Sequence, residues 1–467
     1  MPRQSPLTDL SVTSLAALVA SREVTAVEVV QSHLDRIEQT NQQINAVVTV
    51  EADRALNEAK QVDRAARDGQ VGPLAGVPIT VKDIISTAGT RTTWSSRLLA
   101  EHVPSRDATA VARLRAAGAI VIGKSNCPEF GLDIQTDNDL FGTTLNPLDL
   151  SLTPGGSSGG DSAAVAAGFA AAGIGTDYGG SLRWPAQCTG LVGLRPTAGL
   201  VPGDGQQPAP APFEPPPFSA QGLLQVIGPI TRDVTDAALV LDVLGETVNQ
   251  SAPKNKVSSS EIHIAYTETG AGGPVHPEIR STVATAAKVL DELGFPIEEL
   301  DRELLLDAEE IYTRLRHQEG LGVVPVLARG REHLLSAQMR DQVAASNPAS
   351  VPDYLATVAE RQHLLTRVLA QLEVTPILVM PVSALPAFEA GTRTFELEGS
   401  PLSSWQVLGP SRAISLLGLP SLSIPFGRDN QGRHLSVQIV GRPFREDEVL
   451  HVARALEQVR TPHLPSG

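Results

Sequence analysis

The first part of the chain carries apolar residues at helical spacing. A set of five residues recurs every three or four positions: Val27, Val30, His33, Leu34 and Ile37. This spacing places the set on one face of a helix. The preceding run Thr25-Ala26-Val27-Glu28 fits a capping box, in which the Thr and Glu side chains bond each other's backbone N–H groups. The pattern predicts a helical region over residues 1–68 that wraps the core.

From about residue 69 the pattern changes to short apolar runs that alternate with helical stretches. Residues 77–81 and 119–122 read as buried strands, and 108–117 reads as a helix between them. Such alternation predicts an α/β sheet with helices on both faces. Residues 258–374 read as a strand followed by long amphipathic helices. The length of 467 residues by itself suggests two or three domains.

Composition narrows the classes of partner. The net charge is −15, and the acidic residues are spread along the chain, which argues against nucleic acid or an anionic membrane as a partner. The first nine residues lack the apolar core of a signal peptide. The small-residue run 162–175 is too short and too rich in glycine to span a bilayer. We therefore expect a cytoplasmic protein.

The two cysteines, Cys127 and Cys188, show no metal-ligand spacing. We therefore expect packed thiols, with neither a disulfide nor a zinc site, and no metal or cofactor.

Two glycine-rich loops that contain serines are the feature that folding alone does not explain. They cover residues 153–160 and 175–181, and an alanine-rich helix separates them. Glycine at this density indicates positive φ angles or a close approach of the backbone to a small ligand. Consecutive N–H groups in such a turn can bind the negative charge of a tetrahedral intermediate. The loops therefore indicate acyl transfer by a serine nucleophile.

The nucleophile needs a base, and no histidine lies near the loops; the nearest are His102 and His263. Lys82 ends the apolar run 76–81, where a lysine is unusual. To act as a base near neutral pH, its pKa must fall by roughly 3 units from about 10.4, which burial can supply. Asp83 would point to the opposite face of the strand. The alternative for a lone lysine is a side chain that reaches to water.

These segments together resemble the amidase signature family. The matching runs are Gly76 to Asp83, Pro154 to Gly160, Gly175 to Arg183, Gly190 to Thr197 and Gly418 to Pro425. The first three of these runs carry separate motifs, and their consistent order is far more specific than any one of them. The resemblance implies one large α/β domain over residues 69–467, with a mixed sheet, in place of several domains.

The resemblance also implies roles for residues at the matching positions. Ser181 corresponds to the family's nucleophile, Ser157 to a bridging serine that follows a cis peptide bond, and Lys82 to the base. The oxyanion hole would be formed by the backbone N–H groups of Tyr178, Gly179, Gly180 and Ser181. Positions that support the loops are Ser158, Thr176, Asp177 and Arg183. The implied reaction is hydrolysis of a carboxylic amide to an acid and ammonia or an amine.

The substrate pocket is less defined by sequence. Tyr178 and Trp184 are bulkier than the family's usual residues, so they either pack in the core or narrow the acyl pocket. A proline-rich insert over residues 206–218 reads as an extended surface loop or a lid that offers Phe213 and Phe218. From this bulk we expect Trp184, Phe213 and Phe218 to line the pocket, and neutral apolar or aryl acyl groups to be preferred.

Two further motif matches are set aside. Residues 118–125 fit the phosphate-binding pattern GxxxxGK[ST], but their variable positions are Ala-Ile-Val-Ile, which read as a strand. Residues 155–159 fit the GxSxG elbow of α/β-hydrolase esterases, but no apolar strand precedes them. The elbow also leaves Lys82 and Ser181 without a role.

The subclass rests on one position. The glutaminase subunits of tRNA-dependent amidotransferases carry an aspartate for glutamine where this chain has Leu408. That favours a stand-alone amidase of small-molecule amides, acting alone or as a homodimer. The alternative is the glutaminase subunit of such an amidotransferase. A catalytically inactive scaffold is disfavoured because Lys82, Ser157 and Ser181 are all present.

Overall fold

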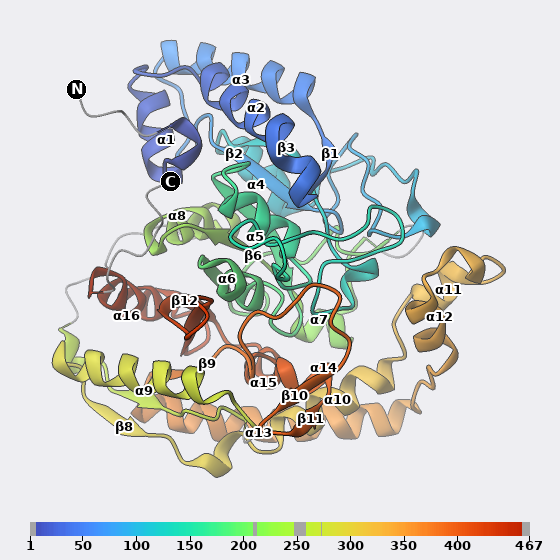
Figure 1. The fold of residues 1–467 in the computed structure, drawn as a ribbon, viewed down its shortest axis with the longest axis vertical. Coiled ribbons are helices and arrows are strands. Elements are labelled where there is room, and N and C mark those ends of the chain that lie inside the picture. Colours follow the sequence, from blue (N-terminus) through green and yellow to red (C-terminus); the bar gives the residue numbers. More distant parts are fainter. Residues whose placement is uncertain (1–5, 209–212, 247–257, 272, 460–467) are drawn as a thin grey trace.

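The computed structural model describes residues 6–208, 213–246, 258–271 and 273–459. They form a single α/β domain in which helices flank a large central sheet (Figure 1). Among these residues the sheet has eleven strands. In spatial order they are β1 (Val47–Val50), β3 (Ile120–Ser125), β2 (Pro78–Lys82), β4 (Ala172–Asp177), β6 (Val226–Thr231), β5 (Val192–Arg195), β12 (Ser421–Arg428), β13 (His434–Gly441), β9 (Ile377–Pro381), β7 (Ile264–Tyr266) and β8 (Ile297–Glu299).

The sheet is mixed. β2 runs parallel to β3 and β4, and β7 runs parallel to β8 and β9. The remaining neighbours are antiparallel. Because β2 and β4 are parallel neighbours, with Val81 opposite Ile174, their carboxyl ends meet at one edge of the sheet. Lys82 ends β2 and Asp177 ends β4, so this edge brings the lysine to the second serine loop.

Helices cover both faces of the sheet (Figure 1). The structure describes them as α1 (Val12–Ala20), α2 (Ala26–Ile44), α3 (Ala52–Arg67), α4 (Thr109–Ala116), α5 (Gly159–Ala166), α6 (Arg183–Thr189), α7 (Ala220–Leu224), α8 (Val234–Gly245), α9 (Pro277–Glu292), α10 (Ala308–Glu319), α11 (Val324–Ala328), α12 (Ala337–Ala344), α13 (Val351–Val374), α14 (Ser404–Val407), α15 (Gly409–Leu417) and α16 (Glu446–Val459). A separate hairpin pairs β10 (Phe395–Leu397) with β11 (Ser400–Leu402).

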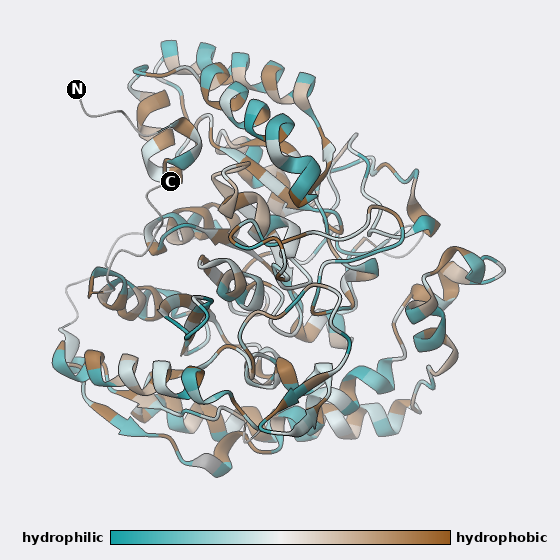
Figure 2. Cartoon of the chain, viewed as in Figure 1, coloured by the Kyte–Doolittle hydropathy of each residue, from teal (hydrophilic) through white to brown (hydrophobic). Residues whose placement is uncertain are grey.

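The amino-terminal helices form as their sequence predicts. Thr25 caps α2, and both halves of the capping box with Glu28 are present. Val29, Val30 and Ile37 are buried, and α2 packs against α3. Figure 2 shows polar and apolar stretches alternating along both helices. Within residues 1–68 the structure also places β1, a short edge strand that pairs with β3.

The predicted α/β sheet is confirmed, with boundaries shifted by one to three residues. The strands predicted over 77–81 and 119–122 are β2 and β3, and the helix predicted over 108–117 is α4. The stretch 258–374 begins with a short 3-10 helix (Ser259–Glu261), and then contains β7 followed by long helices, as expected. It also contains β8, which the pattern did not reveal because two of its three residues are exposed glutamates. A polar edge strand of this length has no apolar run to detect.

In the described part of the chain, no helix is both long and apolar enough to cross a membrane. Cys127 and Cys188 are buried free thiols, which confirms that they are packed side chains. Residues 209–212 of the proline-rich insert lie outside the described residues.

Candidate active site

Lys82 is fully buried at the end of β2, and its ammonium group meets three hydroxyl groups. Its Nζ donates to Ser157 Oγ at 2.7 Å, Ser158 Oγ at 3.0 Å and Thr176 Oγ1 at 2.9 Å. Burial lowers the pKa of Lys82 to about 8, although the nearby Cys127, Asp161 and Asp177 oppose the shift. The expected fall in pKa is therefore present in direction and cause, and the alternative of a side chain that reaches to water is wrong.

Asp83 faces away from Lys82, as the strand geometry predicted. Its carboxylate accepts hydrogen bonds from the Thr93 N–H at 3.1 Å and the Thr93 hydroxyl. Burial raises the pKa of Asp83 to about 6, with Lys124 opposing the rise. Lys124 is the lysine of the phosphate-binding pattern, and it is buried in β3, where its Nζ donates to Thr87 Oγ1 at 2.8 Å. The variable positions of that pattern lie in or directly before β3, so no phosphate loop exists there.

The first serine loop turns sharply between Thr153 and α5. Gly155 has φ +83°, a conformation that favours glycine, and the Gly156–Ser157 peptide bond is cis. A Cβ on Gly156 would lie 2.7 Å from the Gln135 backbone nitrogen, so only glycine fits. Ser157 is 3% exposed and reaches Lys82 on one side and the cavity described below on the other. Its bond to Lys82 gives the GxSxG serine a lysine partner, not the histidine that an elbow would need.

The second serine loop joins β4 to α6 and is held by Asp177. The Asp177 carboxylate accepts from the Gly180 N–H at 2.8 Å, the Leu182 N–H at 3.2 Å and the Arg183 guanidinium at 2.9 Å. Burial would raise the pKa of Asp177, but Arg183 and Arg195 outweigh it and hold the pKa well below its usual range. The Ser158 N–H donates to the Ser181 carbonyl at 3.2 Å, which ties the two serine loops together.

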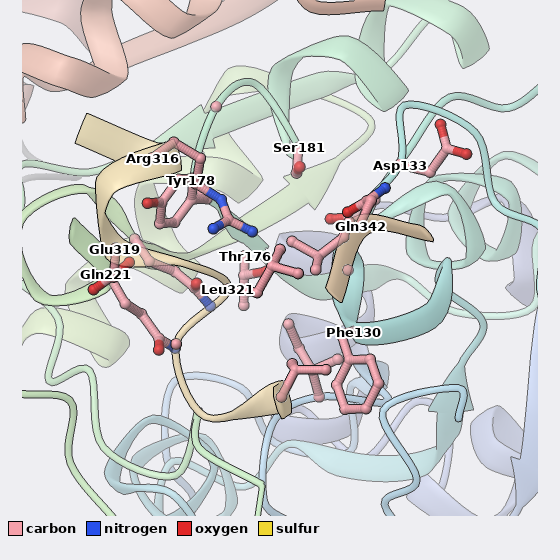
Figure 3. Close-up of a pocket in the computed structure, with 18 of the residues that line it drawn as sticks. Phe130, Asp133, Thr176, Tyr178, Ser181, Gln221, Arg316, Glu319, Leu321 and Gln342 are labelled. Atoms are coloured by element: carbon pink, nitrogen blue, oxygen red, sulfur yellow. The ribbon is translucent and has the colours of Figure 1, made fainter. Parts of the chain in front are cut away.

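A cavity of about 200 Å³ opens beside both serine loops (Figure 3). One wall is formed by residues of the serine loops and the end of β4, namely Ser157, Thr176, Tyr178, Gly179 and Ser181. Apolar side chains on other walls include Trp94, Phe130, Leu321, Trp405 and Leu408. The charged residues that line it are Asp133, Arg316, Glu319 and Arg412. All the predicted catalytic residues and their supporting residues thus lie at or directly behind one cavity.

The three aromatic residues predicted to line the pocket do not line this cavity. Trp184 is fully buried behind it, where its indole N–H donates to the Ile134 carbonyl at 2.9 Å and its ring stacks on Phe388. Phe213 lies under the Arg106 guanidinium, and Phe218 is 68% exposed. The expectation failed because side-chain size in neighbouring sequence does not determine direction. Tyr178, in contrast, does line the cavity.

Sequence reasoning missed the residues that α10 supplies. Tyr312, Arg316 and Glu319 stand four and three residues apart and all line the cavity. This helical spacing was the only available signal, and it is typical of any helix with a buried face. The Tyr312 ring packs edge-on against Tyr178 with centroids 6.0 Å apart, and its hydroxyl contacts Gly179 closely enough to exclude a Cβ there.

No group of three or more metal-ligating side chains occurs among the residues that the structure describes.

Comparison with known proteins identifies the family. The family model Amidase matches residues 28–450. The chain is 35% identical to the A subunit of the glutamyl-tRNA(Gln) amidotransferase of Moorella thermoacetica, over 97% of each chain. It is similar to a solved amidase (TM-score 0.87, 30% identity, 97% of this chain and 100% of the other). It is also similar to a bacterial aryl acylamidase of the amidase signature family (TM-score 0.87, 26% identity, 97% of each). The chain therefore belongs to the amidase family and is an enzyme that hydrolyses amide C–N bonds.

Proposed function

We propose that the chain hydrolyses a carboxylic amide through an acyl-enzyme on Ser181, with Ser157 and Lys82 as a proton relay. The observation that carries this proposal is the 2.7 Å contact between Lys82 Nζ and Ser157 Oγ at the wall of the cavity that Ser181 also lines. A buried amine with a lowered pKa is a suitable general base near neutral pH.

In the proposed sequence, neutral Lys82 takes the proton of the Ser157 hydroxyl as Ser157 takes that of Ser181. The Ser181 oxygen attacks the carbonyl carbon, and the carbonyl π electrons move to its oxygen. When the C–N bond breaks, the relay returns the proton to the leaving nitrogen, and ammonia or an amine departs. Water then attacks the ester through the same relay, which releases the acid and restores Ser181.

The oxyanion is assigned to backbone N–H groups of the second serine loop. Sequence reasoning placed four donors there, from Tyr178 to Ser181. Because the Gly180 N–H donates to Asp177 at 2.8 Å, we assign the oxyanion to the N–H groups of Tyr178, Gly179 and Ser181. Asp177 then acts as a positioning residue, since its bonds to Gly180, Leu182 and Arg183 hold the turn.

The pH dependence of the reaction reports on the base. We expect kcat/KM to rise with pH and to level off above about 8, because Lys82 accepts a proton only when it is neutral and its pKa is lowered to about 8. The measurement is kcat/KM for one neutral amide from pH 5 to 10. A histidine base would instead give a midpoint near its ordinary value of about 6.5.

The curated relatives support the glutaminase subunit of an amidotransferase better than the stand-alone amidase that Leu408 favoured. Identity of 35% extends over nearly the whole of one such relative. The structure also gives Leu408 less weight as a sign of a stand-alone amidase. Leu408 does line the cavity, but Glu319 and Asp133 place carboxyl groups on other walls. Acidic side chains therefore line the cavity from segments that carried no family motif, although Asp133 accepts from Arg393 and Glu319 interacts with the backbone of α7.

A panel of amides separates the two subclasses. We expect ammonia release from glutamine that increases when the other subunits of a tRNA-dependent amidotransferase are added, measured by coupled ammonia assay. Aliphatic and aryl primary amides provide the comparison. If aliphatic or aryl amides were turned over much faster than glutamine, and the added subunits did not change the rate, the result would support a stand-alone amidase.

A further inference from the structure

Arg316 is the one charged residue of the cavity whose charged group has no hydrogen-bond partner among the described residues. It is 9% exposed and lies in the last turn of α10. Figure 3 shows its guanidinium directed toward the middle of the cavity, on the same side as Tyr178, with Ser181 on the adjoining wall. The Tyr178 ring lies 5.8 Å from the guanidinium carbon and orients it.

The other charged groups of the cavity are already engaged. Asp133 accepts from Arg393 at 2.8 Å. Arg412 donates to the Ser404 carbonyl at 3.2 Å and lies over the Trp405 ring at 4.4 Å.

Glu319 lies one turn after Arg316 on α10 and reaches the start of α7. Its carboxylate interacts with the backbone of Ala220 and Gln221 there, and burial raises its pKa even though Arg316 opposes the rise. No ion pair joins Glu319 to Arg316 within the described residues. The Arg316 guanidinium, with five donors in a planar fork, therefore remains available to a ligand.

The Arg316 side chain is nearly buried but its guanidinium is open to the cavity, where water or a ligand must bond to it. The planar fork of arginine matches a carboxylate, which it binds with two parallel hydrogen bonds. The geometry points to Arg316 as the residue that binds a carboxylate group of the substrate, so that the preferred amides carry a carboxylate, as glutamine does. This inference rests on the proposed hydrolysis at Ser181. It replaces the expectation of neutral acyl groups, which assumed few charged residues near the loops.

Matched anilides test the inference. The acyl series consists of three pairs of 4-nitroanilides with acyl chains of equal length: succinyl and butyryl, glutaryl and valeryl, and adipyl and hexanoyl. The first member of each pair ends in a carboxylate and the second in a methyl group. The leaving half is tested with acetanilides that bear a 4-carboxylate or a 4-methyl group. In at least one series we expect the carboxylate member to have the higher kcat/KM. In Arg316→Met, the ratio of kcat/KM for the carboxylate member to kcat/KM for the methyl member of that series should fall by about 10- to 100-fold. This is the usual loss for a hydrogen bond to a charged group.

Two variants control the experiment. Arg316→Lys keeps the charge without the fork and should retain part of the ratio. Arg314→Met removes an arginine two residues away that pairs with Glu310 at 3.5 Å and lines no part of the cavity; it should leave the ratio unchanged. An unchanged ratio in Arg316→Met, or preference for the methyl member in every series, overturns the inference.

Calorimetry with the full chain separates this inference from the catalytic proposal, because binding needs no turnover. We expect glutaramate, the monoamide of glutarate, to bind Ser181→Ala more tightly than the neutral pentanamide does, and the added Arg316→Met change to remove the difference. If the wild type were neither labelled by a fluorophosphonate probe nor active on amides, but the difference in binding remained, the result would contradict the relay alone. Equal binding of the two amides by Ser181→Ala would overturn the anion site.

Discussion

Replacement of Ser181 by alanine should abolish both turnover and covalent labelling by a fluorophosphonate probe. The reason is that only the Ser181 oxygen is proposed to bond to the acyl carbon, and no second nucleophile can take its place without rebuilding the relay. Mass spectrometry of the labelled peptide gives the modified residue directly. We expect the wild-type label on Ser181.

Ser158→Ala provides a comparison from the first serine loop. Ser158 Oγ accepts from Lys82 at 3.0 Å and donates to the Thr176 carbonyl at 3.1 Å, so its loss should slow the reaction without ending labelling at Ser181. A label on Ser157 or Ser158, with Ser181 unmodified, would refute the proposed nucleophile.

Replacement of Lys82 by methionine should leave a folded protein that has lost several orders of magnitude in rate. Loss of a general base typically removes about 10² to 10⁴ in rate, and here the nucleophile also depends on that base. Methionine has similar length and no charge, and the site that receives it is fully buried. Circular dichroism and a thermal melt establish folding, and kcat/KM together with the labelling rate gives the effect.

Lys124 offers a matched control, because it is a second fully buried lysine whose pKa burial also lowers to about 8. Its Nζ donates to Thr87 and the Ile85 carbonyl and does not line the cavity. Lys124→Met should lower stability and leave the rate per folded molecule much closer to that of the wild type. Equal losses for the two variants would show that the rate depends on the buried polar network as a whole and not on Lys82 as the base.

Local signals in the sequence were enough to predict individual helices and strands, including the strand that carries Lys82. The capping box at Thr25 starts α2, and the apolar run before Lys82 forms β2. These features depend on backbone preferences and side chains within about four residues of one another. The positions of Lys82, Ser157 and Ser181 in the motifs also sufficed to name the family.

The contacts that make a site were decided by the tertiary structure. Lys82 and Ser157 are 75 residues apart, and they meet because α5, which begins directly after the first serine loop, packs against β2 and β4. The motif that provides the N–H groups of the second serine loop does not say which of them faces Asp177. In the fold, the turn after β4 directs the Gly180 N–H to that carboxylate.

The far walls of the cavity show the limit of sequence most clearly. Arg314 and Arg316 are the same residue type on one helix, yet Arg314 pairs with Glu310 and Glu360 near the surface while Arg316 lines the cavity. Two residues of an α-helix are about 200° apart around its axis, so one faces inward when the other faces outward. Sequence predicted long amphipathic helices within residues 258–374 without their bounds; the packing of α10 against α13 and α15 decided which arginine lines the cavity.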